Sequence, residues 1–272
     1  MSEKGIVVVR GGGDIATGTI CRLHRCGFRV LVLETGAPTA IRRTVSLCEA
    51  IYDGETTVED LTAVHVNNPD QCEQVWRAGK VPIYIDLKGK CITTLQPIAV
   101  VDAILAKKNF GTHTAMAPVT IALGPGFTAG EDVHAVIETA RGHSLGRVIL
   151  HGKALANSGI PGTIQGYNRE RVVYAKATGQ LHIIHDIGNH VTAGETIAMI
   201  GNTPVKAPIT GLIRGLLRND FPVHQGLKIA DIDPRIDEKD NCYTISDKAR
   251  CISGGVIEAL LFLSNTNNRN QL

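Results

Sequence analysis

The chain has 272 residues, of which 43% are apolar and 20% are charged, and its formal net charge is +2. This composition is typical of a folded protein rather than a disordered one. No run of like charges exceeds two residues, which argues against nucleic acid and anionic membranes as partners. The chain shows no leader-like start and no apolar run near the roughly 18 residues of a membrane span, so we expect a cytoplasmic protein.

The cysteines and histidines do not form a metal-binding pattern. Seven cysteines, an odd number without a C-x-x-C pair, are typical of reduced thiols. His182 and His185 lie in a predicted strand, where residues at this odd spacing point to opposite faces. We therefore predict no metal site.

The start of the chain, up to Glu34, predicts a β-α-β unit. The stretch "GIVVVRG" (5–11) reads as a strand buried on both faces, and "FRVLVLE" (28–34) reads as the next strand. Asp14 suits the N-cap of the helix between them, and Gly27 suits its C-terminal stop.

The loop after the first strand fits a nucleotide-binding pattern. Gly11, Gly13 and Ala16 match G-x-G-x-x-A, and Glu34 ends the second strand where a ribose-binding acid stands in such folds. Backbone amides of Gly11, Gly12 and Gly13 are the expected contacts. The alternative is that the glycines only allow close packing.

Asp14 complicates this interpretation of the loop. A carboxylate at the start of a helix competes with an anion for the helix amides, which weakens the case for NAD. Asp14 could instead contact a hydroxyl, a base or a metal-bridged phosphate of the ligand, so it stays among the candidate contacts.

Further strands and helices alternate up to residue 150. Strands are expected at 62–66, 81–87, 117–124, 132–139 and 146–151, and helices around 40–51, 69–78 and 97–107. This order predicts a Rossmann-like, doubly wound α/β domain over residues 1–150, which binds ligands beyond the carboxyl ends of its strands. No Gly-Lys-Ser/Thr follows the glycine loop, so a P-loop triphosphatase is excluded.

Two other stretches of this domain are candidate ligand contacts. Gly124 and Gly126, in "GPGFTAG", follow a predicted strand and suit close approach of the backbone to a ligand, or else a plain tight turn. Arg42 and Arg43 begin a predicted helix and could hold a phosphate, or else serve solubility. We assign no catalytic residue.

An internal sequence repeat marks a second domain over residues 172–235, joined to the first by a connection over 151–171. Gly179 aligns with Gly211, and Gly194 aligns with Gly226. The pattern predicts two interleaved β-hairpins and resembles the barrel-sandwich hybrid of biotinyl and lipoyl carrier domains. Lys206, the only lysine of the joining segment, does not stand at the hairpin tip, so we expect neither biotin nor lipoate.

The C-terminal segment, 236–272, contains a predicted helix over about 254–263. Ser253 is its expected cap, and Gly254 and Gly255 fall in its first turn. We expect these glycines to be open for contact with an anion or to pack against another segment.

Taken together, these blocks resemble the YqeB family. The resemblance rests on "RGGGDIATGTICRLHRCGFRVLVLE", "PTAIRRTVS", "GPGFTAGEDVHAVIETARGHSLGRVI", "APITGLIRGLL" and "ISDKARCISGGVIEA", and runs from about residue 5 to 263. It implies an accessory role in maturing selenium-dependent molybdenum hydroxylases, with the hydroxylase or its cofactor-insertion machinery as partner. It implies no settled reaction.

Three functions stay open at this point. The first is a maturation protein that binds the cytosine-dinucleotide form of the molybdenum cofactor, or a related nucleotide, at the glycine loops. The second is an NAD-dependent oxidoreductase, for which the glycine loop and Glu34 speak, although no proton-relay pair is evident. The third is a non-enzymatic scaffold that docks the hydroxylase. A homo-oligomer is compatible with each of the three.

Overall fold

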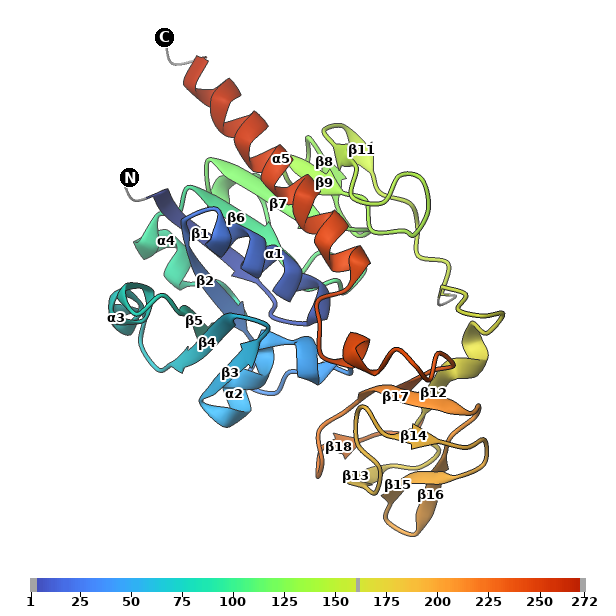
Figure 1. Cartoon of the computed structure of the whole chain (residues 1–272). Coiled ribbons are helices and arrows are strands. Elements are labelled where there is room, and N and C mark those ends of the chain that lie inside the picture. Colours follow the sequence, from blue (N-terminus) through green and yellow to red (C-terminus); the bar gives the residue numbers. More distant parts are fainter. Residues whose placement is uncertain (1–3, 160–161, 270–272) are drawn as a thin grey trace. The chain divides into compact units, whose positions relative to one another are not determined.

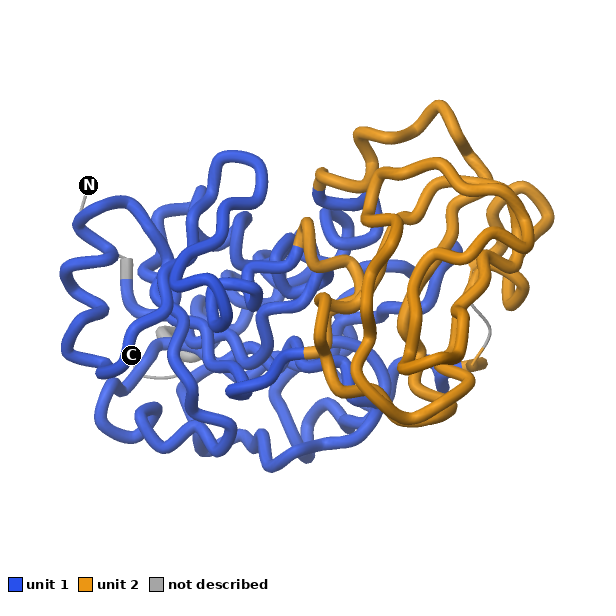
Figure 2. Tube along the Cα trace, turned by 90° about the horizontal axis from the view of Figure 1, so that it is seen from below, with its two compact units in different colours: residues 1–38, 46–157, 245–272 blue, residues 39–45, 158–244 orange. Residues whose placement is uncertain are grey.

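This computed structural model of the chain describes residues 4–159 and 162–269. The chain forms two compact units, and it enters each of them more than once (Figure 2). Unit 1 contains residues 1–38, 46–157 and 245–272, and unit 2 contains residues 39–45 and 158–244. The predicted boundaries differ from these. The second unit also contains residues 39–45, 158–171 and 236–244, and the first also contains residues 151–157 and those from 245 onward. Ile160 and Pro161, within the predicted connection, lie outside the described residues.

Unit 1 is built on a nine-stranded mixed sheet with the order β10-β9-β7-β6-β1-β2-β5-β4-β3. Its inner strands, from β9 to β4, pair in parallel, and the outer strands β3 and β10 pair antiparallel. The strands are β1 (Lys4–Arg10), β2 (Phe28–Glu34), β3 (Glu55–Val58), β4 (Leu61–Val66), β5 (Val81–Ile85), β6 (Ala99–Asp102), β7 (Val119–Leu123), β9 (Ala135–Ile137) and β10 (Val148–Ile149). A separate ribbon pairs β8 (Thr128–Ala129) with β11 (Gly152–Lys153). The predicted α/β class is thus confirmed, with a large mixed sheet.

Helices cover both faces of this sheet. Helices α1 (Asp14–Arg25) and α5 (Asp247–Arg269) run side by side across one face (Figure 1). They approach closely because Gly18 has no side chain: a Cβ there would lie 2.8 Å from the Cβ of Ala249. The other face carries α3 (Cys72–Arg77) and α4 (Cys91–Leu95), whose apolar side chains pack on Val8, Leu31 and Val100.

Two of the helices predicted within residues 1–150 are wrong. The stretch predicted as a helix over 97–107 forms β6, which pairs with β1 and β7 at the centre of the sheet. A short apolar run with β-branched residues fits a buried strand as well as a helix, so periodicity alone could not separate the two. The stretch 40–51 forms the 3-10 turns Arg43–Val45 and Leu47–Glu49, followed by the short helix α2 (Ala50–Asp53).

The ends of two other helices also differ from the prediction. The N-cap of α1 is Gly13, and Asp14 is the first helical residue, not the cap. Helix α5 starts at Asp247, so Ser253 is not a cap but lies inside the helix, where its hydroxyl donates to the Arg250 carbonyl. Gly254 and Gly255 therefore lie in the body of α5. A Cβ at Gly255 would collide with the Gly146 carbonyl oxygen, so this glycine serves packing.

Unit 2 consists of two four-stranded sheets with the orders β12-β19-β17-β14 and β16-β15-β13-β18. Its strands are β12 (Val172–Tyr174), β13 (Gly179–Ile183), β14 (His190–Val191), β15 (Thr196–Ile200), β16 (Thr203–Lys206), β17 (Gly211–Leu216), β18 (Pro222–Val223) and β19 (Lys228–Asp233). The halves interleave, because β13 pairs with β18 and β17 pairs with β14. Their inner faces share one apolar core that includes Leu181, Ile197, Ile213 and Ile229.

The internal repeat of unit 2 is visible in the backbone hydrogen bonds. The Gly194 amide donates to the Ala207 carbonyl, and at the equivalent place in the second half the Gly226 amide donates to the carbonyl of Ala175. Ala175 precedes Ala207 by the same spacing that separates Gly194 from Gly226, so the duplication includes β12 and starts earlier than the sequence alignment did. At the β15–β16 turn the register leaves Gly201 and Asn202 at the tip, and Lys206 lies within β16.

No helix within the described parts of the chain has the length and apolar character needed to span a membrane.

Candidate functional site

The predicted glycine loop lies at the carboxyl edge of the unit 1 sheet, directly after β1. Its amides are engaged within the chain. The Gly11 amide donates to the Leu33 carbonyl (2.8 Å), and the Gly12 amide donates to Glu34 Oε2 (2.8 Å). A phosphate bound as in dinucleotide folds needs such amides as donors, so two of the three expected contacts are already taken.

Glu34 performs the role that an external anion would have at this loop. Besides its bond to Gly12, its Oε1 accepts from the Thr35 amide at 2.8 Å. Burial raises the pKa of the Glu34 carboxyl, and the bonds from the Thr35 and Gly12 amides act in the opposite direction. The acid that we predicted to bind a ribose therefore accepts hydrogen bonds from backbone amides of the chain itself.

Cys48 packs directly against the glycine loop. Its amide donates to the Gly12 carbonyl at 2.9 Å, and a Cβ at Gly12 would lie 3.1 Å from the Cβ of Cys48. Burial raises the pKa of the Cys48 thiol well above its ordinary value, and the nearby carboxylates of Glu34, Glu49 and Asp14 raise it further. This thiol is held protonated, which is the opposite of what activates a nucleophilic cysteine.

The other glycines of the predicted site allow close packing of the segment that follows β6. A Cβ at Gly11 would lie 3.0 Å from the Ala103 carbonyl oxygen, and one at Gly126 would lie 2.7 Å from the backbone of Lys107 and Lys108. Gly11 (φ +95°) and Gly126 (φ +112°) also adopt backbone angles that disfavour a side chain. A Cβ at Gly124 would meet the Thr139 hydroxyl. At these positions the structure supports the packing interpretation.

A buried cluster outside the predicted site residues holds this edge together. Arg10, at the end of β1, is 2% exposed, and its Nη2 donates to the carbonyls of Leu87 (2.9 Å) and Phe110 (3.3 Å). Its Nη1 donates to the Thr112 hydroxyl, which in turn donates to Asp102 Oδ2 at 2.6 Å. Burial raises the pKa of Asp102, while Thr112 and the Arg10 charge lower it. One guanidinium therefore ties the loop after β5 to the loop after β6.

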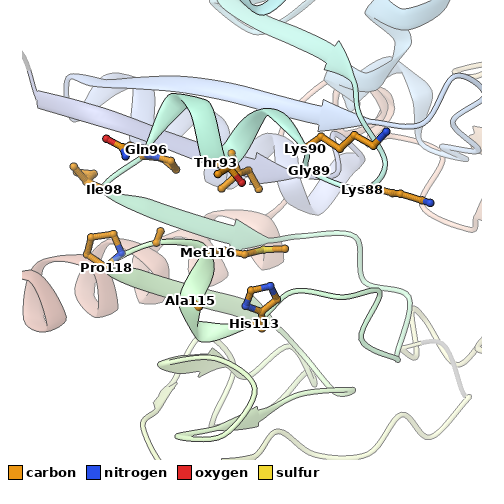
Figure 3. A pocket seen from close by; sticks show the side chains of 13 residues that line it. Lys88, Gly89, Lys90, Thr93, Gln96, Ile98, His113, Ala115, Met116 and Pro118 are labelled. Carbon is orange, nitrogen blue, oxygen red and sulfur yellow. The ribbon is translucent and has the colours of Figure 1, made fainter.

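A groove opens beside these two loops on the face of the sheet that carries α4. Its volume is about 760 Å³, and it lies between α4 and the 3-10 turn Thr114–Met116 (Figure 3). Two lysines lie at one end, and apolar side chains together with Thr93, Gln96 and His113 line the rest. The lining residues are Lys88, Gly89, Lys90, Ile92, Thr93, Gln96, Pro97, Ile98, His113, Ala115, Met116, Ala117 and Pro118. The groove is of the size of a small-molecule site.

Arg42 and Arg43 belong to unit 2 and are bound within it. Arg42 Nη2 donates to the carbonyls of Asn241 (2.9 Å) and Thr244 (3.4 Å), and Arg43 Nη2 pairs with the Asp186 carboxylate. The structure thus brings Gly11–Asp14 and Glu34 together in unit 1 but gives both arginines other partners. Asp14 also has a bonding partner.

Two histidines of unit 2 lie beside surface carboxylates. His182 Nδ1 is 3.0 Å from Asp220 Oδ1, and His185 Nε2 is 3.1 Å from Glu195 Oε1. Among the described residues no group of three or more His, Cys, Asp or Glu side chains is arranged to hold a metal ion.

Comparisons with known proteins give a strong sequence match to a curated relative. No protein-family profile matches the chain. The chain is 50% identical over 258 residues to the Escherichia coli protein described as "Uncharacterized protein YqeB". The match covers 95% of this chain and 48% of the relative, so the chain spans about half the length of the protein it resembles. Over this shared stretch the chain is thus similar to the Escherichia coli YqeB protein.

Among solved structures the similarities are weak. An aspartoacylase family protein from Mesorhizobium loti is 11% identical, with 84% of each chain covered and a TM-score of 0.28. The ectoine utilization protein EutE (DoeB) from Ruegeria pomeroyi is 12% identical, with 78% of this chain and 61% of that chain covered and a TM-score of 0.25. Scores this low carry no argument about fold or activity.

Proposed function

We propose that this chain is an accessory protein for the maturation of selenium-dependent molybdenum hydroxylases. In this role it binds a phosphate-bearing cargo, the cytosine-dinucleotide form of the molybdenum cofactor or a related nucleotide, at the carboxyl edge of the unit 1 sheet. The resemblance to the YqeB family supplies the biological context. The hydroxylase, or the machinery that inserts its cofactor, is the partner, and the cytoplasm is the expected compartment.

The observation that carries the proposal is the topological switch point of the unit 1 sheet, which lies at β1. From β1 the chain proceeds to β2 on one side, and it later returns to place β6 on the other side of β1. Ligands of open α/β sheets bind in the crevice outside such a switch point. The loops after β1, β5 and β6 meet there around Arg10. We interpret this unit as Rossmann-like.

In this proposal unit 2 is a docking module. Its duplicated, interleaved halves favour the barrel-sandwich-hybrid interpretation, and the lysine-free hairpin tip at Gly201 and Asn202 argues against a swinging arm. We propose that this unit contacts the hydroxylase without carrying a covalently attached biotin or lipoate.

The arrangement of Glu34 disfavours an NAD-dependent oxidoreductase. A ribose-binding acid must offer its carboxylate to the cofactor's hydroxyls. Both oxygens of Glu34 instead accept from backbone amides of the chain.

The test is calorimetric titration of the purified protein with CTP, ATP, NAD and isolated molybdenum cofactor. We expect binding of CTP or the cofactor and none of NAD. In parallel, deletion of the gene should lower the molybdenum cofactor content of the hydroxylase. An unaltered cofactor content would overturn the maturation role. A lowered content without any ligand binding would leave the scaffold function in its place.

A further inference from the structure

The groove beside α4 differs from the glycine loop in the chemistry that it offers. Figure 3 shows Lys88 and Lys90 at one end, near the start of α4, and Gln96, Ile98 and Pro118 at the other end. His113 and Met116 line the opposite wall.

The lysines at the basic end of the groove form no ion pair among the described residues. Lys88 and Lys90 are both exposed, and neither has a carboxylate partner in the part of the chain that the structure describes. None of the described residues that line the groove is an aspartate or a glutamate. Two cations without a neutralising carboxylate are a favourable environment for a phosphate group.

A second cavity on the other side of α4 is less suited to an anion. It has a volume of about 680 Å³ and shares Lys88 and Lys90, but Asp70 and Asp86 line it as well. Asp86 Oδ2 accepts from the Cys91 amide at 2.9 Å, which fixes the carboxylate on that side of the helix. Because carboxylates line the second cavity but not the groove, we assign the anion to the groove.

Hydrogen bonds from Arg10 and Asn109 hold the loops at the basic end of the groove in position. Arg10 bonds the carbonyl of Leu87, which precedes Lys88, and it also bonds the Phe110 carbonyl and the Thr112 hydroxyl, which precede His113. Asn109 fixes the same loop, because its Oδ1 accepts from the amides of Gly111 and Thr112 at 2.8 Å. Backbone anchoring of this kind reduces the ordering cost of ligand binding.

We propose that the groove, and not the glycine loop, is the phosphate-binding site of this chain. The ligand class is a phosphate ester of a flat heterocycle. The phosphate lies between Lys88 and Lys90, and the ring lies against Ile92, Met116 and Ile98. This inference rests on the proposed function for the identity of the cargo, and it places that cargo on the α4 face of the sheet.

The experiment uses the full chain and two probes, inorganic pyrophosphate and CTP, in calorimetric titrations. K88E/K90E should weaken the binding of both probes by roughly 10- to 100-fold, as expected for the loss of charge-assisted hydrogen bonds. K153E/K176E changes the net charge equally at exposed positions outside the groove and should leave both affinities unchanged. A115W fills the apolar part and should weaken CTP binding while pyrophosphate binding is kept.

The outcomes separate this inference from the proposed function. Unchanged affinities in K88E/K90E, with CTP still bound, would overturn the groove and leave the nucleotide function standing. Pyrophosphate binding that depends on Lys88 and Lys90, without binding of CTP or molybdenum cofactor, would support the groove and remove the proposed cargo. Binding of neither probe to the unaltered protein would overturn the groove as a phosphate site.

Discussion

The glycine loop and the basic end of the groove lie at the same edge of one sheet, yet they differ in how they would receive an anion. At the loop, the Gly12 amide is bound by a carboxylate of the chain itself, Glu34. At the groove, Lys88 and Lys90 face solvent without a carboxylate partner among the described residues. The loop contains the glycine motif of nucleotide-binding folds, whereas the groove contains the two lysines that form no ion pair among the described residues. The comparison teaches that a glycine pattern locates a crevice without showing which of its walls holds the ligand.

The strongest test of this comparison is Arg10→Met, because Arg10 anchors the loops of the groove. The change leaves Asp102 buried without its cation, and removal of one partner from a buried pair costs about 3–5 kcal/mol of unfolding free energy. Urea denaturation measures the loss. Combining it with Asp102→Asn should recover part of the stability. A loss below about 1 kcal/mol would show that the loops do not depend on this clamp.

A second test addresses the packing of the segment after β6. Gly126→Ala places a methyl group 2.7 Å from the backbone of Lys107 and Lys108, at a φ of +112°. We expect a loss of about 2–4 kcal/mol from the clash and the backbone strain together. Gly111→Ala is the matched control, since its φ is +89° but no atom lies within 4 Å, and it should cost only about 1 kcal/mol. Equal losses in the two variants would mean that close packing is not the role of Gly126.

The parts of the fold that the sequence predicted are those with strong local signals. The unit β1-α1-β2 has two apolar strands around an amphipathic helix, and its observed bounds nearly coincide with the prediction. The internal repeat likewise predicted the interleaved strands of unit 2. In contrast β6, a short apolar run, depends on its neighbours β1 and β7, which no local pattern reports.

The residues of the predicted glycine loop lie close together, but the contacts that they make could not be predicted from the sequence. Gly11, Gly12 and Glu34 do meet, but the bond between Gly12 and Glu34 joins residues 22 positions apart and cannot be read from spacing. The Arg10 clamp joins residues 77 to 102 positions apart. The one sequence signal for it was an arginine at the end of an otherwise apolar strand, since such a side chain is buried only when it has partners.

A smaller effect separates the roles of two neighbouring glycines. Gly12→Ala forces Cys48 to move, because the new methyl group would lie 3.1 Å from its amide and Cβ, and we expect a loss of about 1–2 kcal/mol. Gly13→Ala meets no atom within 4 Å at a φ of −68°, so it should cost at most about 1 kcal/mol as an altered N-cap. Thermal unfolding compares the two. If the loop is a packing device, pyrophosphate affinity is unchanged in Gly13→Ala, and a marked loss there would return the phosphate to the loop.

The smallest expected effect concerns the pH dependence that Glu34 contributes. Burial raises the pKa of this carboxyl in the folded protein, so its contribution to stability is fully present below its unfolded pKa and is lost as pH rises through the folded value. Glu34→Gln removes the titration. The stability of the unaltered protein relative to this variant should therefore fall between pH 4 and pH 7, as measured by urea denaturation at several pH values. A rise over the same range would mean that the Gly12 and Thr35 amides favour the carboxylate more than burial disfavours it, and Glu34 would then be a strong internal anion that no external phosphate displaces.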